Sequence, residues 1–183
     1  SGSLARGVAW GQTAPAIDAI ERVASGRRAA VATVHPLASR AALAALDRGG
    51  NAIDAAVAAS LMLSVVDGHN SGLGGGCLAL VRTADGAVHA WDGRETAPRQ
   101  ARPEMFYRDG QPDPELSQTG PLAAGVPGLV ATLDKLAAAY GRMPWVDALE
   151  GAAQVADEGF ELTAGNARVL RSVADRVARF PAS

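Results

Sequence analysis

The chain has little of what marks a disulfide-stabilised, membrane-spanning or nucleic-acid-binding protein. It has one cysteine in 183 residues, so an internal disulfide and a cysteine-based metal cluster are both excluded. Aromatic residues make up only 4%, and no apolar run is long enough to cross a bilayer. Acidic and basic residues are interspersed and the net charge is −2, so no single-sign field attracts nucleic acid or an anionic membrane. No metal or cofactor is implied.

What the chain does contain is a large share of small apolar residues, above all alanine. Apolar residues make up 48% of the sequence, which is enough to bury a sizeable core within one ordinary domain. Many alanines and few aromatic residues favour helices that pack closely, and disfavour an all-β sandwich. We therefore expect a single α+β domain that is rich in helix.

Hydrophobic periodicity and helix breakers predict the elements of the first third. A short helix is expected over residues 14–24, and the β-capable run 29–34 predicts a buried strand that a following His-Pro ends. A proline begins a helix over 36–48, and two glycines end it. Asn51 is the expected N-cap of a helix over 51–66, whose apolar stripe and alanines predict burial on nearly all sides.

The middle of the chain predicts a hairpin followed by a long loop. A glycine-rich segment over 71–76 precedes a strand over 77–82, and an Asp-Gly turn leads to an antiparallel strand over 87–91. Residues 93–121 are rich in proline and charge and predict a long loop, with one short helical piece near 103–107. Long loops within compact domains are often functional.

Three helices are expected to close the chain, over 127–140, 144–158 and 163–179. Glycines lie where the first two should stop. The last helix carries four arginines that we expect on its solvated side: Arg168, Arg171, Arg176 and Arg179.

The glycine run invites comparison with phosphate-binding loops, because consecutive backbone N–H groups can hold an anion. No Gly-Lys-Ser/Thr follows it and no dinucleotide-binding spacing is present, so a structural role is favoured. We expect the glycines to let the helix that ends near Val66 pack closely against the strand that begins at Cys77.

The histidines and the cysteine give weaker signals. His35, before a proline, is expected to cap a turn, while His89 alternates within a predicted strand without any marking feature. His69 lies beside the glycine run, so a place in the lining of a site stays open, although a structural or surface role is favoured. Cys77 begins a strand and lacks a basic neighbour that would lower its pKa, which favours an inert buried thiol.

The order of these motifs resembles the γ-glutamyltranspeptidase family over about residues 30–180. The resemblance is carried by Val34-His35-Pro36-Leu37-Ala38, Gly49-Gly50-Asn51 through Ala58, Asn70-Ser71-Gly72 through Gly76, Asp92-Gly93-Arg94-Glu95-Thr96-Ala97-Pro98, Gly125-Val126-Pro127-Gly128 and Tyr140-Gly141. One departure is Asp67-Gly68-His69-Asn70, which stands where the family more commonly has Glu-Pro before the glycine run.

The resemblance implies that this chain is the N-terminal portion of a large subunit, as a single domain that is incomplete without a small subunit from the same precursor. The whole enzyme would have the αββα sandwich of N-terminal-nucleophile hydrolases. Its nucleophile would be a threonine freed on the small subunit by self-cleavage, so no catalytic residue is expected in this chain. Arg94 would bind the α-carboxylate of the donor, and Glu95 would hold or balance Arg94.

The function that the resemblance implies is γ-glutamyl transfer or hydrolysis from glutathione-like donors, to water or to an amino acid or peptide. Alternatives are a related amidase, such as a poly-γ-glutamate transpeptidase or β-lactam acylase, or a non-catalytic binding module on the same scaffold. The resemblance also favours a periplasmic or extracellular location, with a cytoplasmic one left open.

Overall fold

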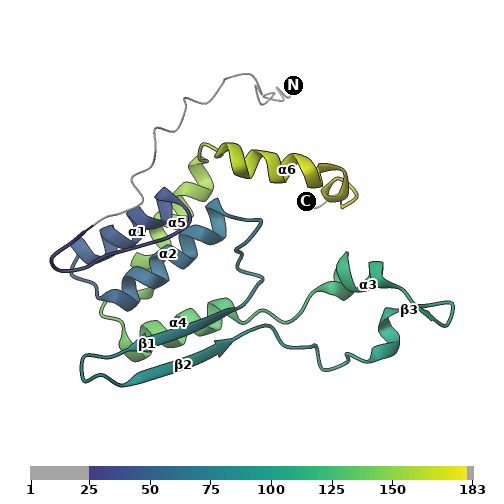
Figure 1. The fold of residues 1–183 in the computed structure, drawn as a ribbon, viewed down its shortest axis with the longest axis horizontal. Helices are drawn as coiled ribbons and strands as arrows, with labels where there is room; N and C mark the ends of the chain where they lie inside the picture. Colours follow the sequence, from purple (N-terminus) through teal and green to yellow (C-terminus); the bar gives the residue numbers. More distant parts are fainter. Residues whose placement is uncertain (1–24, 181–183) are drawn as a thin grey trace, which may run out of the picture. The chain divides into compact units, whose positions relative to one another are not determined.

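The computed structural model describes residues 25–180, which are helix-rich and of the α+β class (Figure 1). Residues 31–162 form one compact unit, and the described residues 25–30 and 163–180 belong to a second one. The helix predicted over residues 14–24 lies outside the described residues. No helix in the described part combines the length and the apolarity that a membrane crossing requires.

Two helices predicted from their end signals are present. α1 (Pro36–Asp47) has proline at its first position, and His35 caps it by accepting the Leu37 N–H at Nδ1, 3.2 Å away. α2 (Ala52–Val66) begins with a capping box, in which Asn51 and Asp54 accept each other's backbone N–H groups. The predicted cap residues, Asn51 and His35, are thereby confirmed.

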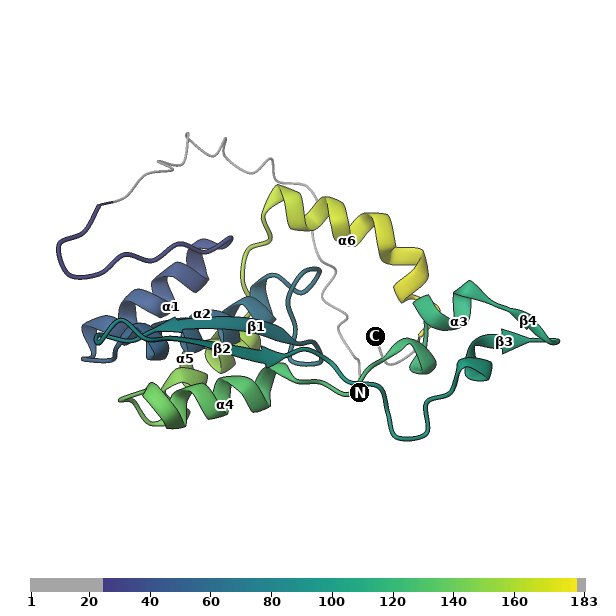
Figure 2. The same cartoon turned by 60° about the horizontal axis from the view of Figure 1, so that its bottom comes forward.

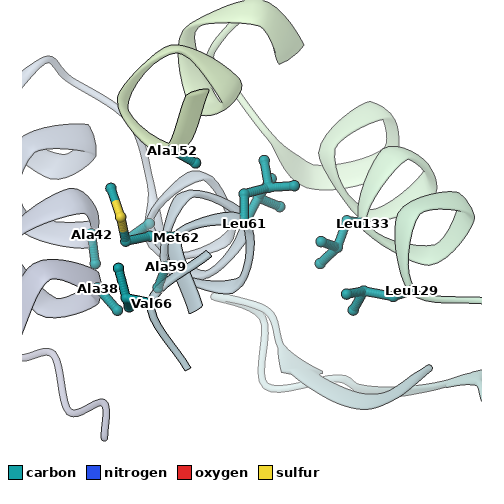
Figure 3. Close-up of a cluster of buried hydrophobic side chains, with 11 residues drawn as sticks. Ala38, Ala42, Ala59, Leu61, Met62, Val66, Leu129, Leu133 and Ala152 are labelled. Carbon is teal, nitrogen blue, oxygen red and sulfur yellow. The ribbon is translucent and has the colours of Figure 1, made fainter. Parts of the chain in front are cut away.

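α2 is the centre of the hydrophobic core, as predicted. It packs against α1, α4 (Leu129–Tyr140) and α5 (Trp145–Glu158), and Figure 3 shows its apolar side chains turned toward all three neighbours. On α1 the buried residues are the alanines Ala38, Ala42 and Ala45, which let the two helix axes approach closely. Larger side chains of α2, such as Val57 and Leu61, are almost completely buried.

The polar residues that begin α2 also fix the connection between α4 and α5. The Asn51 amide donates to the Tyr140 carbonyl at the end of α4, with Nδ2 and O 2.6 Å apart. Asp54, which is only 3% exposed, accepts the backbone N–H groups of Arg142 and Met143 at distances of 3.0 to 3.2 Å. Residues at the start of α2 thus satisfy backbone groups at the end of α4 and in the connection to α5.

The predicted hairpin is formed by β1 (Cys77–Arg82) and β2 (Val88–Gly93), which pair antiparallel with Ala79 opposite Trp91 (Figure 2). α4 packs against β2, where the Tyr140 ring lies 6.1 Å from the Trp91 ring, edge to face. The opposite face of the hairpin exposes apolar side chains, since Leu78, Leu80 and Val88 are 72%, 78% and 64% exposed.

The predicted long loop contains more structure than its sequence indicated. It holds η1 (Pro103–Phe106), β3 (Tyr107–Arg108) paired with β4 (Gln111–Pro112), α3 (Pro114–Gln118) and η2 (Pro121–Ala123), and only the helical piece η1 was predicted. Thr96 and Val126 close the base of this excursion by exchanging two backbone hydrogen bonds of 3.2 and 2.9 Å. The excursion therefore starts and ends at one place, directly after Arg94 and Glu95.

The prediction of a buried strand over residues 29–34 is wrong. No described residue of this run is in a strand, and Val34 is 77% exposed. A β-capable sequence becomes a strand only where another strand offers its N–H and C=O groups. Within residues 25–180 the hairpin strands pair with each other and not with this run.

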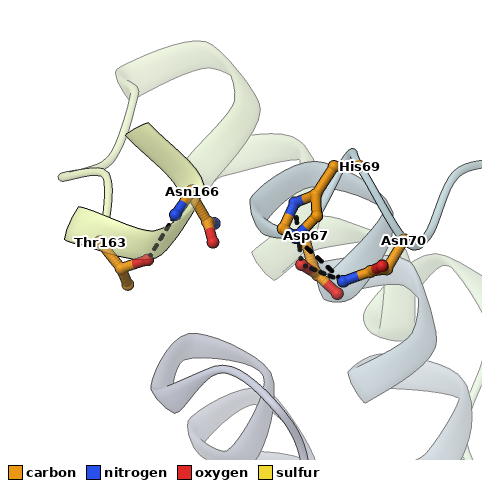
Figure 4. Close-up of polar contacts among 5 residues, drawn as sticks. All are labelled: Asp67, His69, Asn70, Thr163 and Asn166. Carbon is orange, nitrogen blue, oxygen red and sulfur yellow. Dashed lines mark hydrogen bonds and ion pairs between the residues drawn. The ribbon is translucent and has the colours of Figure 1, made fainter. Parts of the chain in front are cut away.

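The last predicted helix is α6 (Ala164–Val177). The Thr163 hydroxyl caps it by accepting the Asn166 N–H at 3.1 Å, as Figure 4 shows. None of its described residues is buried, and its arginines are exposed, as the sequence predicted.

Candidate functional site

Arg94 and Glu95 form an ion pair directly after β2. The Arg94 Nη2 lies 3.0 Å from the Glu95 Oε2, and the two side chains are 59% and 27% exposed. The Arg94 backbone N–H donates to Asp92 Oδ1 at 2.9 Å, which fixes the direction in which the chain leaves the strand. An exposed ion pair of this kind contributes about 0–1 kcal/mol to stability. Because Glu95 contacts one nitrogen of the guanidinium, it orients Arg94 without occupying all of its N–H donors.

A pocket of about 390 Å³ lies beside this ion pair. Its wall combines residues from α2, the glycine run, the start of β1, the end of β2 and the start of α4: Ser60, Leu63, Asn70, Ser71, Gly72, Gly75, Gly76, Cys77, Arg94, Glu95 and Leu129. The volume is within the range of small-ligand sites, and the wall includes one exposed cation. The structure thus brings both predicted site residues, Arg94 and Glu95, to a single pocket.

The glycine run allows the Arg94 segment to approach the start of β1. A Cβ at Gly76 would lie 2.6 Å from the Gly93 carbonyl oxygen and 2.8 Å from both the Arg94 Cα and the Glu95 Oε2. A Cβ at Gly125 would lie 2.9 Å from the Glu95 Cβ. The structural role predicted for the glycines is correct, but the segment that they approach is Arg94–Glu95 and not the end of α2.

The start of α4 is tied to the same run. The Gly75 carbonyl accepts the N–H groups of Gly128 and Leu129, at 3.1 and 3.0 Å. Two of the N–H groups that a helix start offers to an anion are therefore already satisfied by the protein. This contact favours a structural role for the glycines over a phosphate-binding one.

Cys77 is partly buried and lies in the pocket wall. Burial raises the pKa of its thiol, while a hydrogen bond with Thr132 and the charge of Arg94 lower it to a smaller extent. The prediction that no basic group lies near Cys77 is therefore wrong in space, because Arg94 adjoins it. The prediction of a weakly reactive thiol agrees with the direction of the pKa shift.

The three histidines have different surroundings. His35 is buried at the start of α1, and burial lowers the pKa of its ring. The His69 Nδ1 lies 3.3 Å from the Asp67 Oδ1, beside the pocket residue Asn70. His89 lies on β2, with its ring 5.7 Å from the Tyr140 ring. None of the three is among the residues that line the pocket.

The pocket wall is suited to binding more than to nucleophilic attack. The Ser60 hydroxyl donates to the Ala56 carbonyl of its own helix at 2.8 Å, so its proton is not directed to a base. Among residues 25–180, no three side chains of His, Cys, Asp or Glu lie close enough together to hold a metal ion. What this part of the chain offers a ligand is a guanidinium, a carboxylate and hydrogen-bonding groups.

Sequence reasoning missed Ser60 and Asn70 as pocket residues. Ser60 lies in the middle of a helix, and nothing in the sequence distinguishes it from its neighbours. Asn70 belongs to the Asp67–Asn70 segment whose departure from the usual family pattern was visible, and that departure was the available signal.

Comparisons with known proteins agree on one family. Residues 38–183 match the Gamma-glutamyltranspeptidase family profile. Glutathione hydrolase 2 of Arabidopsis thaliana is 40% identical over 156 residues, which cover 85% of this chain and 26% of that protein. The glutathione hydrolase proenzyme of Escherichia coli is 40% identical over 131 residues, which cover 71% of this chain and 23% of that protein.

A solved structure is also similar. The crystal structure of Helicobacter pylori gamma-glutamyltranspeptidase superposes with a TM-score of 0.84 at 35% identity, over 87% of this chain and 46% of that one. The chain spans about a quarter of the length of the two glutathione hydrolases. Much of each relative therefore has no counterpart in this sequence.

Proposed function

The chain belongs to the γ-glutamyltranspeptidase family, and on that premise we propose that it forms the N-terminal part of the large subunit of a γ-glutamyltransferase or glutathione hydrolase. The reaction is transfer of a γ-glutamyl group from a glutathione-like donor to water, an amino acid or a peptide. The observation that carries the proposal is Arg94, an exposed guanidinium paired only with Glu95 among the described residues, in the wall of a 390 Å³ pocket.

Arg94 is the donor-binding residue in this proposal. A guanidinium presents parallel N–H groups that match a carboxylate, so it selects both charge and orientation. Glu95 supports it from 3.0 Å, while leaving other N–H donors for the α-carboxylate. The close approach of Gly76 sets the position of this segment against the start of β1.

The nucleophile belongs to another segment of the same precursor. A threonine that becomes N-terminal on cleavage can attack the γ-carbonyl with its own amino group as base. The proenzyme name of the E. coli relative is in keeping with a precursor that is cleaved. The family resemblance also favours a periplasmic or extracellular site of action.

A small subunit from that precursor is the proposed partner, and the exposed face of the hairpin supports it. Leu78 and Leu80 are on one face of β1, and Val88 joins them because it pairs with Arg82. Within residues 25–180, β1 and β2 pair only with each other, so each keeps an open edge. An apolar face with open edges is suited to further strands that extend and cover a two-stranded sheet.

The full-length precursor tests the proposal. We expect it to cleave a γ-glutamyl anilide, and to cleave the α-carboxamide analogue of that substrate at least about tenfold less efficiently, because a charge-assisted contact with the carboxylate is lost. Equal rates on the two anilides would contradict the proposed donor. Preference for a glutaryl anilide, which lacks the α-amino group, would favour an acylase instead.

A further inference from the structure

The start of α1 and the end of α2 lie at the same end of a helix pair. The two helices pack side by side, and the short connection over residues 48–51 reverses the chain between them (Figure 1 and Figure 2). Figure 3 shows Ala38 of α1 beside Val66 of α2, and both are almost fully buried. His35 is the N-cap of α1, one turn before Ala38. Asp67 is the C-cap of α2, directly after Val66, so the pairing brings the two cap residues together.

Both cap side chains are buried, and each has one polar atom without a partner. His35 and Asp67 are 7% and 5% exposed. The His35 Nε2 and the Asp67 Oδ2 make no hydrogen bond with the described residues. The Phe160 ring lies edge to face against the His35 ring, at 6.3 Å, and offers it no acceptor. Because buried polar atoms are nearly always satisfied by protein or by ordered water, two such atoms at one place indicate a shared partner.

The proton positions make these two atoms complementary. The His35 Nδ1 accepts the Leu37 N–H at 3.2 Å, so the proton of the neutral ring is on Nε2, which is a donor. The Asp67 Oδ2 is a carboxylate oxygen and therefore an acceptor. Burial lowers the pKa of the His35 ring, and the charge of Asp67 raises it to a smaller extent, while that of Arg40 lowers it. The carboxylate thus lies within electrostatic reach of the ring.

Asp67 also holds the turn that leads into the pocket. Its carbonyl accepts the backbone N–H groups of Asn70 and Ser71 at 3.0 and 2.9 Å, and both of these residues line the pocket. Its Oδ1 lies 3.3 Å from the His69 Nδ1, as Figure 4 shows. The carbonyl and Oδ1 are therefore used within the turn, which leaves Oδ2 to fix Asp67 to the rest of the core. A shift of Asp67 would move this part of the pocket wall.

We propose that the His35 Nε2–H and the Asp67 Oδ2 bind one buried water molecule between them, and that this bridge makes His35 a positioning residue for the pocket wall. One water suffices, because it accepts from the ring N–H and donates to the carboxylate at the same time. His35 touches no ligand and acts through Asp67, whose turn carries the wall. The effect on donor binding rests on the proposed γ-glutamyl function.

Two substitutions of His35 separate the bridge from the helix cap. The amide oxygen of His35→Asn takes the place of Nδ1, so the cap on the Leu37 N–H remains and the bridge donor is lost. The longer side chain of His35→Gln brings an amide N–H near the position of Nε2, so the bridge donor remains and the cap is weakened.

Kinetics of the full-length precursor with γ-glutamyl anilide compare the two variants. We expect His35→Asn to raise KM about threefold or more with kcat changed less than about twofold, because the wall binds donor and transition state alike. His35→Gln should stay within about twofold of wild type in KM. The reverse order, with KM raised in His35→Gln and unchanged in His35→Asn, would assign the effect to the helix cap and overturn the positioning role.

A double-mutant cycle on urea unfolding measures the bridge without activity. Either His35→Asn or Asp67→Ala breaks the same link, so the double variant should lose less stability than the sum of the two single losses. His89→Asn combined with Asp67→Ala is the matched control, because His89 is an exposed histidine outside the pocket and these losses should add. Additive losses for both pairs would overturn the bridge. Coupling in a precursor that does not cleave the anilide would support the bridge and contradict the proposed function.

The wild-type precursor provides a test that needs no variant to fold. Nitrogen chemical shifts of ¹⁵N-labelled histidine report the tautomer, and we expect the proton of neutral His35 on Nε2, with slower solvent exchange than the ring N–H of His89. A crystal structure should place one water within hydrogen-bond distance of both the His35 Nε2 and the Asp67 Oδ2. A proton on the Nδ1 of neutral His35, or a crystal structure without that water, would overturn the proposal.

Discussion

Asp54 is predicted to contribute strongly to the stability of this fold, although no catalytic role is expected for it. Its carboxylate accepts the Asn51 N–H at 2.7 Å, the Arg142 N–H at 3.0 Å and the Met143 N–H at 3.2 Å. Asp54→Ala would leave these three backbone donors without an acceptor. Each unsatisfied buried group costs about 1–3 kcal/mol, and because these donors are partly buried we expect a total loss of about 3 kcal/mol.

Urea unfolding of the full-length precursor measures this loss. The slope of the urea dependence is about 1–3 kcal/mol per molar for small proteins and larger for a longer chain, so a loss of about 3 kcal/mol should lower the midpoint of the precursor by roughly 1 M or less at unchanged slope. Asp54→Asn should lie between wild type and Asp54→Ala, because one amide oxygen remains as an acceptor. Asp47→Ala is the matched control, since Asp47 is an exposed acid at the end of α1 and its loss should change the stability by less than about 0.5 kcal/mol. Equal midpoints for the two alanine variants would refute the reasoning.

Three further predictions concern the pocket and the first helix. Gly76→Ala places a methyl group 2.6 Å from the Gly93 carbonyl, so thermal stability and donor kcat/KM should both fall, whereas Gly74→Ala, with no atom within 4 Å, should change neither. Cys77 in the native precursor should react with iodoacetamide much more slowly at pH 7 than after unfolding, because burial raises its pKa; equal labelling rates by mass spectrometry would contradict this. Burial lowers the pKa of His35, so the unfolded state binds the extra proton more tightly and stability falls as pH decreases below about 6.5. His35→Asn keeps a capping residue and should remove part of that slope in melting temperature against pH.

Local signals were sufficient where an element depends on its own residues. Pro36 and Asn51 start helices by supplying a fixed φ and a capping oxygen, and these effects act within one turn of the chain. The Asp85-Gly86 turn predicted the hairpin for the same reason, since Gly86 adopts a φ of +90° that other residues avoid. The predicted and observed elements agree to within a few residues at these places.

Local signals failed where an element depends on a distant partner. The run 29–34 has the composition of a strand, yet strand formation needs a second strand, which a sequence pattern does not supply. The contacts of Asp54 with Arg142 and Met143 span 88 and 89 residues and leave no local mark beyond the capping box.

The candidate site was predicted in part. Arg94 and Glu95 were identified by the order of the family motifs and not by their local sequence, which is that of any charged pair after a strand. Ser60 and Asn70 join them because α2 and the turn after it share the pocket wall with the glycine run, and this arrangement is set by tertiary structure. The role expected for the glycines was correct in kind because close backbone approach favours glycine, whereas the segment that they approach was set by tertiary structure.

The central claim is that Arg94 binds the donor α-carboxylate, and the most direct test is the ratio of kcat/KM for γ-glutamyl anilide to that for its α-carboxamide analogue. In the full-length precursor, Arg94→Ala should lose at least about tenfold on the free carboxylate and most of the preference, and Arg94→Lys should lose less, because charge remains without the paired N–H geometry. Arg108→Ala is the matched control, since Arg108 is 63% exposed and forms an equivalent 3.0 Å pair with Asp113 outside the pocket. Self-cleavage should persist in all three variants. A ratio that is the same in wild type and Arg94→Ala would contradict the account.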